Sequence, residues 1–557
     1  MVESYDVIVV GSGISGGWAA KEFTEKGLKV LLLERGRNVE HIKDYHNANK
    51  APWEMPHRNK ITNQMVENHQ QLSKTGGLTE SSVDFWVNEN ESPYTAIKPY
   101  FWRRGYQVGG RSLTWGRQSY RWSDYDFEAN LREGIAVDWP VRYKDIAPWY
   151  NYVEKFVGIS GSIENLPQLP DGCFLPPMEM NCVEKDVASR IKNFYKDKRR
   201  MIIGRTANLT VPHNGRTNCQ YRNKCDLGCP FGGYFSTQAA TLPAAVSTGN
   251  LTVRPWSIVT RVLYDKDKKR AKGVEVLDAE TNLTYQYNAK IIFLNASTFN
   301  TAWILMNSAT DIWPGGLGSS SGELGHNIID HHVGGGATGE AIGFEDKYVY
   351  GRRANGIYIP RYRNLFGDKR DYLRGFGYQG GAGREGWNRE IPEVQWGESF
   401  KEAMTEPGNW NMSIVSFGEV LPYHENKIFL NNELKDRWGL PTLNIDIELK
   451  ENERKMEKDS LNDAQEMLEN AGLKNVKGFM RKKIIGATHE MGSARMGHSP
   501  KSSVLNKWNQ VWDAPNVFIT DGSFMTSASC VNPSLTYMAF TARAVDYAIA
   551  ELKKLNL

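Results

Sequence analysis

The sequence predicts an α/β fold, α+β overall, in which a nucleotide-binding domain is interleaved with a second domain built on an antiparallel sheet. The chain begins with an apolar strand, a glycine-rich turn and a helix, YDVIVVGSGISGGWAAKEF. Residues 336–477 hold Gly- and Tyr-rich β segments followed by an amphipathic helix. Roughly the last 80 residues carry further glycine-rich turns. A strand-helix unit at one end and alternating β segments in the middle favour two interleaved domains.

The first turn carries a dinucleotide signature. Gly11, Gly13 and Gly16 form GxGxxG between the strand and the helix, whose free amide groups and dipole attract a pyrophosphate. A second strand, LKVLLLE, ends in Glu34, 18 residues after Gly16, where a carboxylate can bind an unphosphorylated ribose. A lone GxGxxG is often a chance match, but strand, helix, second strand and acid follow in order. We therefore predict a Rossmann-like dinucleotide site.

Length and composition limit the function class. A chain of 557 residues is long enough for two or three domains. A net charge of +4 gives no reason to expect a nucleic-acid or membrane partner. No apolar run reaches the length of a membrane span, and no basic segment precedes the first apolar run. We expect no signal peptide and no direct membrane span in this chain.

The domains are predicted to be discontinuous. Residues 1–48, 99–335 and 478–557 are assigned to the nucleotide-binding domain, and 336–477 to a substrate-binding domain with a helix from about Glu451 to Asn470. The polar stretch 49–98 is interpreted as an insertion or lid. Hairpin strands between Leu251 and Leu294 return to the nucleotide. We expect Val259 to add a contact to the adenine.

Four motifs in a fixed order carry a family resemblance. They are VVGSGISGG, RRGYQVGGRSLTWG, LNASTFNTAWILMNS, and HEMGSARMG with ITDGSF and NPSLT. With them the chain resembles the glucose-methanol-choline (GMC) oxidoreductases over nearly its full length. It looks most similar to the catalytic subunits of bacterial gluconate 2-dehydrogenase, fructose dehydrogenase and glucoside 3-dehydrogenase, with pyranose oxidases as more distant relatives. The resemblance implies the GMC fold, a flavin Rossmann-like domain plus a substrate domain, with FAD as the cofactor.

The resemblance places His489 at the family's catalytic histidine and Asn532 at its second catalytic position. Chemistry supports the pair independently, because an alcohol must lose its hydroxyl proton as hydride leaves carbon, and a histidine is a suitable acceptor. The Asn532 amide can orient the hydroxyl and stabilise developing alkoxide charge. His498 is expected to face away from the site. For His331 and His332, in NIIDHH, we favour a structural role.

The resemblance also assigns cofactor contacts. It places Gly109, Gly110, Ser112, Asp521 and Gly522 against the pyrophosphate or the flavin ring. Thr114 stands where pyranose oxidases carry a histidine bonded covalently to the flavin. Because threonine cannot form that bond, we predict non-covalent FAD.

Three clustered cysteines suggest a metal centre. Cys219, Cys225 and Cys229 have the spacing C-x5-C-x3-C with a proline after the last, and three thiolates fit a 3Fe–4S cluster. The spacing resembles that of flavin dehydrogenase subunits that pass electrons through such a cluster to a haem partner. Those relatives often have an additional cysteine where Gln220 stands. A zinc site, with His213 or Cys182 as fourth ligand, and free thiols remain alternatives.

The substrate is harder to predict. Aromatic and amide side chains in the substrate block suit a sugar, and Tyr378 and Gln379 in GYQGG are the candidate contacts. The resemblance favours oxidation of a sugar ring hydroxyl, at carbon 3 of a glucoside, over gluconate or fructose. A glycoside or pyranose oxidase using oxygen is the alternative, and a non-redox flavoprotein is a third. A small accessory subunit and a cytochrome are the implied partners, with periplasmic export on a partner and a cytoplasmic enzyme both open.

Overall fold

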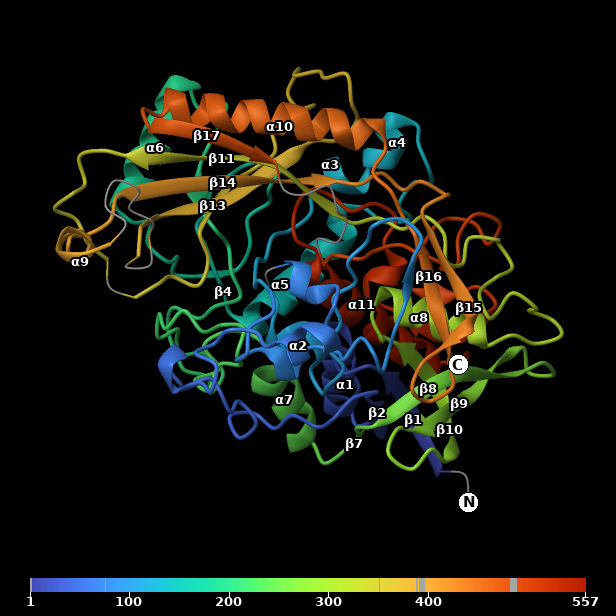
Figure 1. The fold of residues 1–557 in the computed structure, drawn as a ribbon. Helices are drawn as coiled ribbons and strands as arrows, with labels where there is room; N and C mark the ends of the chain where they lie inside the picture. Colours follow the sequence, from blue (N-terminus) through green and yellow to red (C-terminus); the bar gives the residue numbers. More distant parts are fainter. Residues whose placement is uncertain (1–2, 76, 350, 387–388, 390–395, 481–487) are drawn as a thin grey trace.

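Two large sheets dominate the structure, a computed structural model that describes residues 3–75, 77–349, 351–386, 389, 396–480 and 488–557. Each of the predicted segments 1–48, 49–98, 99–335, 336–477 and 478–557 falls mostly within these residues, and their boundaries stay predictions. In Figure 1 the antiparallel sheet lies in the upper part beneath α10 (Glu451–Asn470), and the mainly parallel sheet lies in the lower part. The α/β prediction for the fold is confirmed.

The eight-stranded sheet unites segments from both ends of the chain. Its main order is β18-β19-β10-β1-β2-β7, with β9 also paired to β10 and β8 to β9. The bounds are β1 Glu3–Val10, β2 Val30–Leu33, β7 Leu251–Arg254, β8 Ser257–Asp265, β9 Arg270–Asp278, β10 Thr284–Leu294, β18 Gln510–Val511 and β19 Ala514–Ile519. Strands β19, β10, β1, β2 and β7 run parallel. Parallel strands are covered on both faces, which explains the unbroken apolar runs of β1 and β2.

The six-stranded sheet is antiparallel, in the order β17-β11-β14-β13-β12-β6. The bounds are β6 Ile202–Ile203, β11 His331–Ala341, β12 Ile357–Ile359, β13 Phe376–Arg384, β14 Trp410–Glu419 and β17 Lys474–Met480. Helix α10 covers one face of it (Figure 1), with Met456, Ala464, Met467 and Leu468 buried. Buried and half-buried residues alternate along β14, as expected when only one face of a strand meets the core.

The remaining elements connect or cover these sheets. A three-stranded sheet joins β15 (Lys427–Lys435), β16 (Pro441–Asp446) and β3 (Thr95–Ala96), and β4 (Ile159–Ser160) pairs with β5 (Phe174–Leu175). The other helices are α1 Ile14–Glu25, α2 Asn63–Asn68, α3 Asp124–Phe127, α4 Ala129–Glu133, α5 Tyr143–Val157, α6 Cys182–Phe194, α7 Leu242–Ser247, α8 Thr298–Asn307, α9 Glu398–Thr405 and α11 Ser534–Lys553. Helices α1, α5 and α11 pack on one another.

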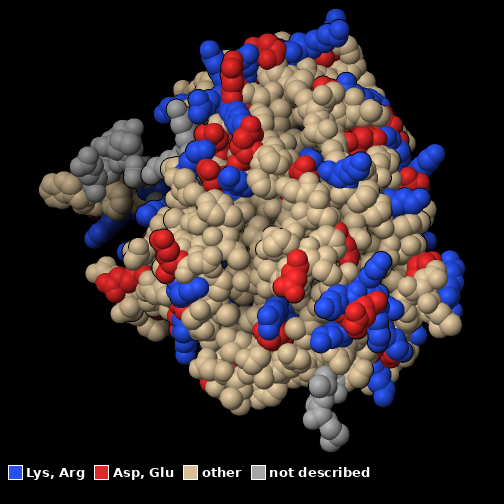
Figure 2. Space-filling view, turned by 90° about the vertical axis from the view of Figure 1, so that its right-hand side faces the viewer, with Lys and Arg blue, Asp and Glu red and all other residues tan. Residues whose placement is uncertain are grey.

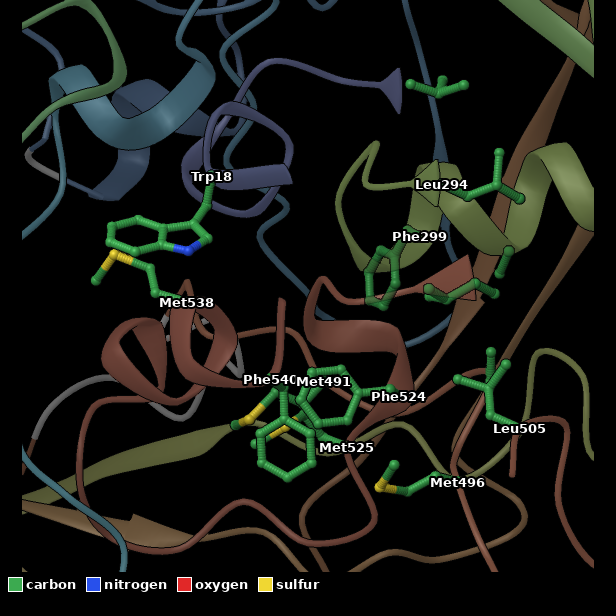
Figure 3. Close-up of a cluster of buried hydrophobic side chains, with 14 of the residues drawn as sticks. Trp18, Leu294, Phe299, Met491, Met496, Leu505, Phe524, Met525, Met538 and Phe540 are labelled. Atoms are coloured by element: carbon green, nitrogen blue, oxygen red, sulfur yellow. The ribbon is translucent and has the colours of Figure 1, made fainter. Parts of the chain in front are cut away.

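The largest hydrophobic core includes buried side chains of the C-terminal motifs. Figure 3 shows Met491, Phe524 and Phe540 close together, with Trp18 of α1 and Phe299 of α8 nearby. Met491, Phe524 and Phe299 are completely buried. Because protein cores are close-packed, the loops that contain Met491 and Phe524 are held rigidly by this core.

Charged side chains of both signs are interspersed on the face shown in Figure 2. Positive and negative side chains are therefore mixed on that face, in keeping with the near balance of charge in the sequence. Among the helices in the described part of the chain, none combines the length and the apolar character needed to cross a bilayer.

Candidate active site

A cavity of about 470 Å³ lies where the two large sheets meet. At one end it is lined by the residues that follow β1 and β2, and at the other by Gln379 of β13, Phe417 of β14 and His489. Nine of the predicted cofactor residues line it: Gly11, Gly13, Glu34, Gly110, Ser112, Thr114, Val259, Asp521 and Gly522. The other two, Gly16 and Gly109, are absent from the lining.

The nucleotide end joins two motifs that are distant in sequence. The Gly109 amide donates to Ser12 Oγ at 2.8 Å, and that hydroxyl donates to Glu34 Oε2 at 2.6 Å. Gly11 adopts φ +87°, and a β-carbon there would lie 2.3 Å from the Asn295 carbonyl oxygen. Only glycine has access to that conformation without strain. The shape of the turn therefore requires glycine at position 11. The hydrogen bond from Ser12 holds Glu34 beside the turn.

The residues at this end fit a pyrophosphate. A β-carbon on Gly13 would meet no atom within 4 Å, so the space before α1 is open to a ligand. Gly13 caps α1 without a side-chain hydrogen bond, and Ile14 and Ser15 also line the cavity. Free amide groups at a helix N-terminus bind phosphate through hydrogen bonds and the helix dipole.

The turn at Asp521 presents its backbone, rather than its carboxylate, to the cavity. Thr301 Oγ1 donates to Asp521 Oδ2 at 2.6 Å, and the Ser523 amide donates to Oδ1 at 2.9 Å. Burial raises the pKa of Asp521. With its carboxylate engaged in this way, the turn can contact a ring chiefly through the peptide groups of Asp521 and Gly522.

The structure brings the two predicted catalytic residues together. His489 Nε2 lies 3.5 Å from Asn532 Nδ2, and both residues line the cavity. An antiparallel bridge between Ile329 and Met491 fixes the segment of His489 against the start of β11. The backbone amide of His489 also donates to Asp330 Oδ1 at 3.2 Å. Asn532 sits at the turn into α11.

His331 is hydrogen-bonded to His489, a contact that our interpretation of the sequence missed. The two Nδ1 atoms are 2.8 Å apart, and His331 Nε2 lies 2.9 Å from the carbonyl oxygen of Ser529. His332 points to the opposite face of β11, where its Nε2 lies 3.0 Å from Met456 Sδ. Strand alternation separates adjacent side chains in this way. Two neighbouring histidines at a strand start were the available signal that one of them faces the site.

Burial lowers the pKa of these histidines. The pKa of His331 falls to about 4 because the ring is buried. The pKa of His489 falls well below its ordinary value, first through burial and then through the nearby His331 and the Arg111 charge. Both rings are therefore neutral near pH 7.

The two candidate substrate residues face opposite directions. Gln379 lines the cavity, and its Nε2 donates to Asn532 Oδ1 at 2.7 Å. Tyr378 is completely buried, and its hydroxyl donates to the Ser460 carbonyl at 2.8 Å and to Asp463 Oδ2 at 2.9 Å, both in α10. The structure therefore brings Gln379 into contact with Asn532 and leaves Tyr378 outside the cavity lining.

An ion pair that sequence reasoning did not single out flanks His489. Arg111 NH2 lies 2.7 Å from Glu490 Oε2, and Arg111 NH1 donates to the Thr488 carbonyl at 3.1 Å. Both Arg111 and Glu490 line the cavity. Each lies inside a family motif, RRGYQVGGRSLTWG or HEMGSARMG, and their opposite charges were the available signal.

The three clustered cysteines lie next to this cavity without lining it. All three are half-buried, and burial raises the pKa of Cys219 and of Cys225. The Tyr221 amide donates to Cys219 Sγ at 3.4 Å. Arg117, which lines the cavity, donates from NH1 to the Cys225 carbonyl at 3.4 Å. The cysteine loop is thus connected to the cavity wall through one residue.

The three cysteines do not belong to the set of side chains that the described part of the chain brings together as a candidate ion site. Within the described ranges, one set of three metal-ligand side chains has all donor atoms within 4.8 Å of one another, Asp330, His331 and His489.

Comparison with known proteins gives the family. Models described as GMC oxidoreductase match residues 69–333 and 422–541. The chain is 27% identical to 2-methyl-1,2-propanediol dehydrogenase of Mycolicibacterium austroafricanum, across 97% of this chain and 94% of that protein. It is 25% identical to the fructose dehydrogenase large subunit of Gluconobacter japonicus, across 99% of both chains.

A solved structure shows the same fold. A formate oxidase variant of Aspergillus oryzae, described in terms of FAD modification, aligns with a TM-score of 0.61 at 14% identity and covers 99% of both chains. Together with the motif order and the cavity geometry, the matching family models establish that the chain belongs to the GMC oxidoreductases, enzymes that bind FAD and act on CH–OH donors.

Proposed function

We propose that the protein is an FAD-dependent sugar dehydrogenase that oxidises a ring hydroxyl of a glucoside, at carbon 3, with His489 as the base and a protein as electron acceptor. The observation that carries the proposal is the 3.5 Å approach of His489 Nε2 to Asn532 Nδ2 at the cavity wall. The carbinol would lose one proton and one hydride and become a ketone.

His489 is suited to take the proton. Its lowered pKa keeps the imidazole neutral at pH values where an ordinary histidine is partly protonated. The Asn532 amide donates toward the same space and can hold the substrate oxygen as negative charge develops on it. Bound FAD supplies the acceptor for the hydride. Thr114 has no nucleophilic ring nitrogen that could bond to the flavin, so we propose that the FAD is bound non-covalently. Acid precipitation of the protein should then release it.

The lining of the cavity suits a sugar. It carries the amides of Gln118, Asn355 and Gln379 and the aromatic rings of Trp115 and Phe417. Amides bond hydroxyl groups and aromatic rings cover C–H faces. Similarity to fructose dehydrogenase and to a diol dehydrogenase is consistent with a polyhydroxy substrate. Methyl glucosides, gluconate and fructose should be compared under anaerobic conditions, with the position of the new ketone read by NMR.

His489→Ala tests the base. We expect the rate of flavin reduction by a methyl glucoside to fall about 10²- to 10⁴-fold while FAD stays bound. His498→Ala is the matched control, because His498 is exposed and its Nε2 lies 3.5 Å from Asp138 Oδ2 rather than in the cavity. Wild-type stopped-flow reduction in His489→Ala would remove this residue from the mechanism.

The proposal includes a 3Fe–4S cluster held by Cys219, Cys225 and Cys229. The hydrogen bond from the Tyr221 amide to Cys219 Sγ is of the kind that tunes cluster thiolates. Arg117 links the loop to the cavity wall, which favours electron transfer from the cavity to the loop. We propose that a cytochrome, held with a small accessory subunit, receives the electrons, and that export to the periplasm occurs on such a partner.

Cys225→Ser tests the cluster. We expect iron and acid-labile sulfide to fall by at least about half relative to the wild type, with flavin reduction unchanged and reduction of a cytochrome impaired. Cys173→Ser is the control, because Cys173 lies in a separate loop where its amide donates to Glu154. Equal iron content in both variants would remove Cys225 as a ligand, and a protein without iron that reduces oxygen rapidly would favour the oxidase alternative.

A further inference from the structure

A directed chain of hydrogen-bonding groups passes through the catalytic histidine. It runs from the Ser529 carbonyl to His331, from His331 to His489, from His489 to Asn532, and from Asn532 to Gln379. The five groups come from four segments that are far apart in sequence. Each contact restricts which nitrogen atom of the next group carries a proton.

The carbonyl of Ser529 sets the direction. A carbonyl oxygen only accepts, so the His331 Nε2 atom at 2.9 Å must carry the proton. His331 is completely enclosed and neutral near pH 7, which leaves its Nδ1 as an acceptor. The Nδ1 atom of His489, 2.8 Å away, must then be the donor. In a neutral imidazole, a proton on Nδ1 leaves Nε2 unprotonated.

The other end of the chain agrees with this direction. Gln379 donates from Nε2 to Asn532 Oδ1 at 2.7 Å, which orients the Asn532 amide with its NH₂ group toward His489. That NH₂ group can only donate, so the His489 Nε2 atom that it faces at 3.5 Å is an acceptor. Two independent constraints therefore give the same tautomer for His489.

We propose that His331 is a positioning residue that holds the proton of His489 on Nδ1 and thereby keeps Nε2 free as the base. This inference rests on the proposed function of His489. His331 does not contact the substrate hydroxyl in this role. It acts as an orienting group, because the hydrogen bond at one ring nitrogen decides which form the other takes.

The charged groups around the pair are compatible with this role. The Asp330 carboxylate accepts the backbone amides of His331 at 2.7 Å and of His489 at 3.2 Å, so it fixes the backbone of both residues. One of its oxygens also lies within 4.8 Å of a ring nitrogen of each histidine. Glu419 faces His331 and favours its protonation, but burial outweighs that effect. Arg111 faces His489 and disfavours its protonation. Both rings therefore remain neutral, as the tautomer argument requires.

The test is the tautomer of His489 in the FAD-bound enzyme. Protein labelled with ¹⁵N in the histidine rings is measured near pH 7.5, and His489 is assigned by comparison with His489→Gln. We expect protonated Nδ1 and unprotonated Nε2 in the wild type. In His331→Leu, which has no acceptor, only the longer 3.5 Å contact with Asn532 still favours the proton on Nδ1. We therefore expect part of the His489 population to carry its proton on Nε2 and flavin reduction to fall about 10- to 100-fold. His331→Asn, whose Oδ1 can accept at the position of Nδ1, should recover part of the rate.

His332→Leu is the matched control, since His332 is buried on the opposite face of the same strand. It should leave the tautomer of His489 and the rate per bound FAD unchanged. A wild-type His489 with its proton on Nε2 would overturn the inference, even if the variants did not fold. Flavin reduction lost in His489→Ala but normal in His331→Leu, with an unchanged tautomer, would overturn this inference alone. Flavin reduction retained in His489→Ala would instead overturn the proposed function.

Discussion

The two ends of the cavity are built in different ways. At the nucleotide end, backbone conformation and local sequence determine the site: Gly11 and Gly13 lie in one turn, and Glu34 comes directly after the next strand, β2. At the other end, which we propose to be the catalytic end, His331, His489 and two amide side chains come from separate segments and meet only in the folded chain. A ligand-binding end made of backbone tolerates few substitutions, whereas a catalytic end made of side chains can lose function without losing the fold.

The largest effect is expected at the nucleotide end, for Gly11→Ala. A methyl group there would lie 2.3 Å from the Asn295 carbonyl oxygen, at φ +87°. The clash and the backbone strain should cost about 2–4 kcal/mol of folding stability, and little FAD should copurify. Thermal unfolding and the FAD-to-protein ratio measure the two effects.

Gly13→Ala is the control for that comparison. Its β-carbon would meet no protein atom within 4 Å, so unfolding of the FAD-free protein should change by less than about 0.5 kcal/mol. FAD binding should still weaken, because the methyl group occupies the space before α1. Equal destabilisation by the two substitutions would show that the turn is not under the backbone constraint described here.

This contrast also explains how much could be predicted from the sequence. The strand, the glycine turn and the acid of the nucleotide end can be predicted from local steric rules. They follow one another within one short segment of the sequence, so no long-range contact has to be known. The contact between His331 and His489 joins residues 158 positions apart and depends on the bridge between Ile329 and Met491. No periodicity in the sequence encodes that bridge. The resemblance pointed to His489, but its contact with His331 became visible only in the fold.

The next largest effect is expected from Arg111→Gln, which alters the pH dependence at the catalytic end. As the proposed base, His489 would act only when unprotonated, so its lowered pKa should keep the enzyme active at more acidic pH. Removing the Arg111 charge should raise that pKa and move the acidic limb of flavin reduction to higher pH. Reduction rates measured between about pH 4 and pH 9 test this shift.

Glu490→Gln should shift the acidic limb of flavin reduction in the opposite direction. It leaves the Arg111 guanidinium without its partner at 2.7 Å, so the pKa of His489 should fall further and the acidic limb should move to lower pH. A limb that moves in the same direction in both variants would exclude the ion pair as the source of the electrostatic effect.

The smallest effects are expected from two adjacent residues on β13, and they compare the two faces of one strand. Gln379→Leu removes the donor to Asn532 Oδ1, so flavin reduction should slow about 3- to 10-fold with little change in stability. Tyr378→Phe removes a hydroxyl bonded at 2.8 Å to the Ser460 carbonyl, and should cost about 1 kcal/mol of stability with the rate unchanged.

The Tyr378 loss stays this small because Asp463, its second acceptor, keeps Arg363 at 2.7 Å and Arg199 at 2.9 Å. Its carboxylate therefore remains paired when the hydroxyl is removed, and no uncompensated buried charge results. Stopped-flow reduction and chemical unfolding of both variants separate the two faces. A slower rate in Tyr378→Phe would mean that the α10 side of the sheet also positions the catalytic amides.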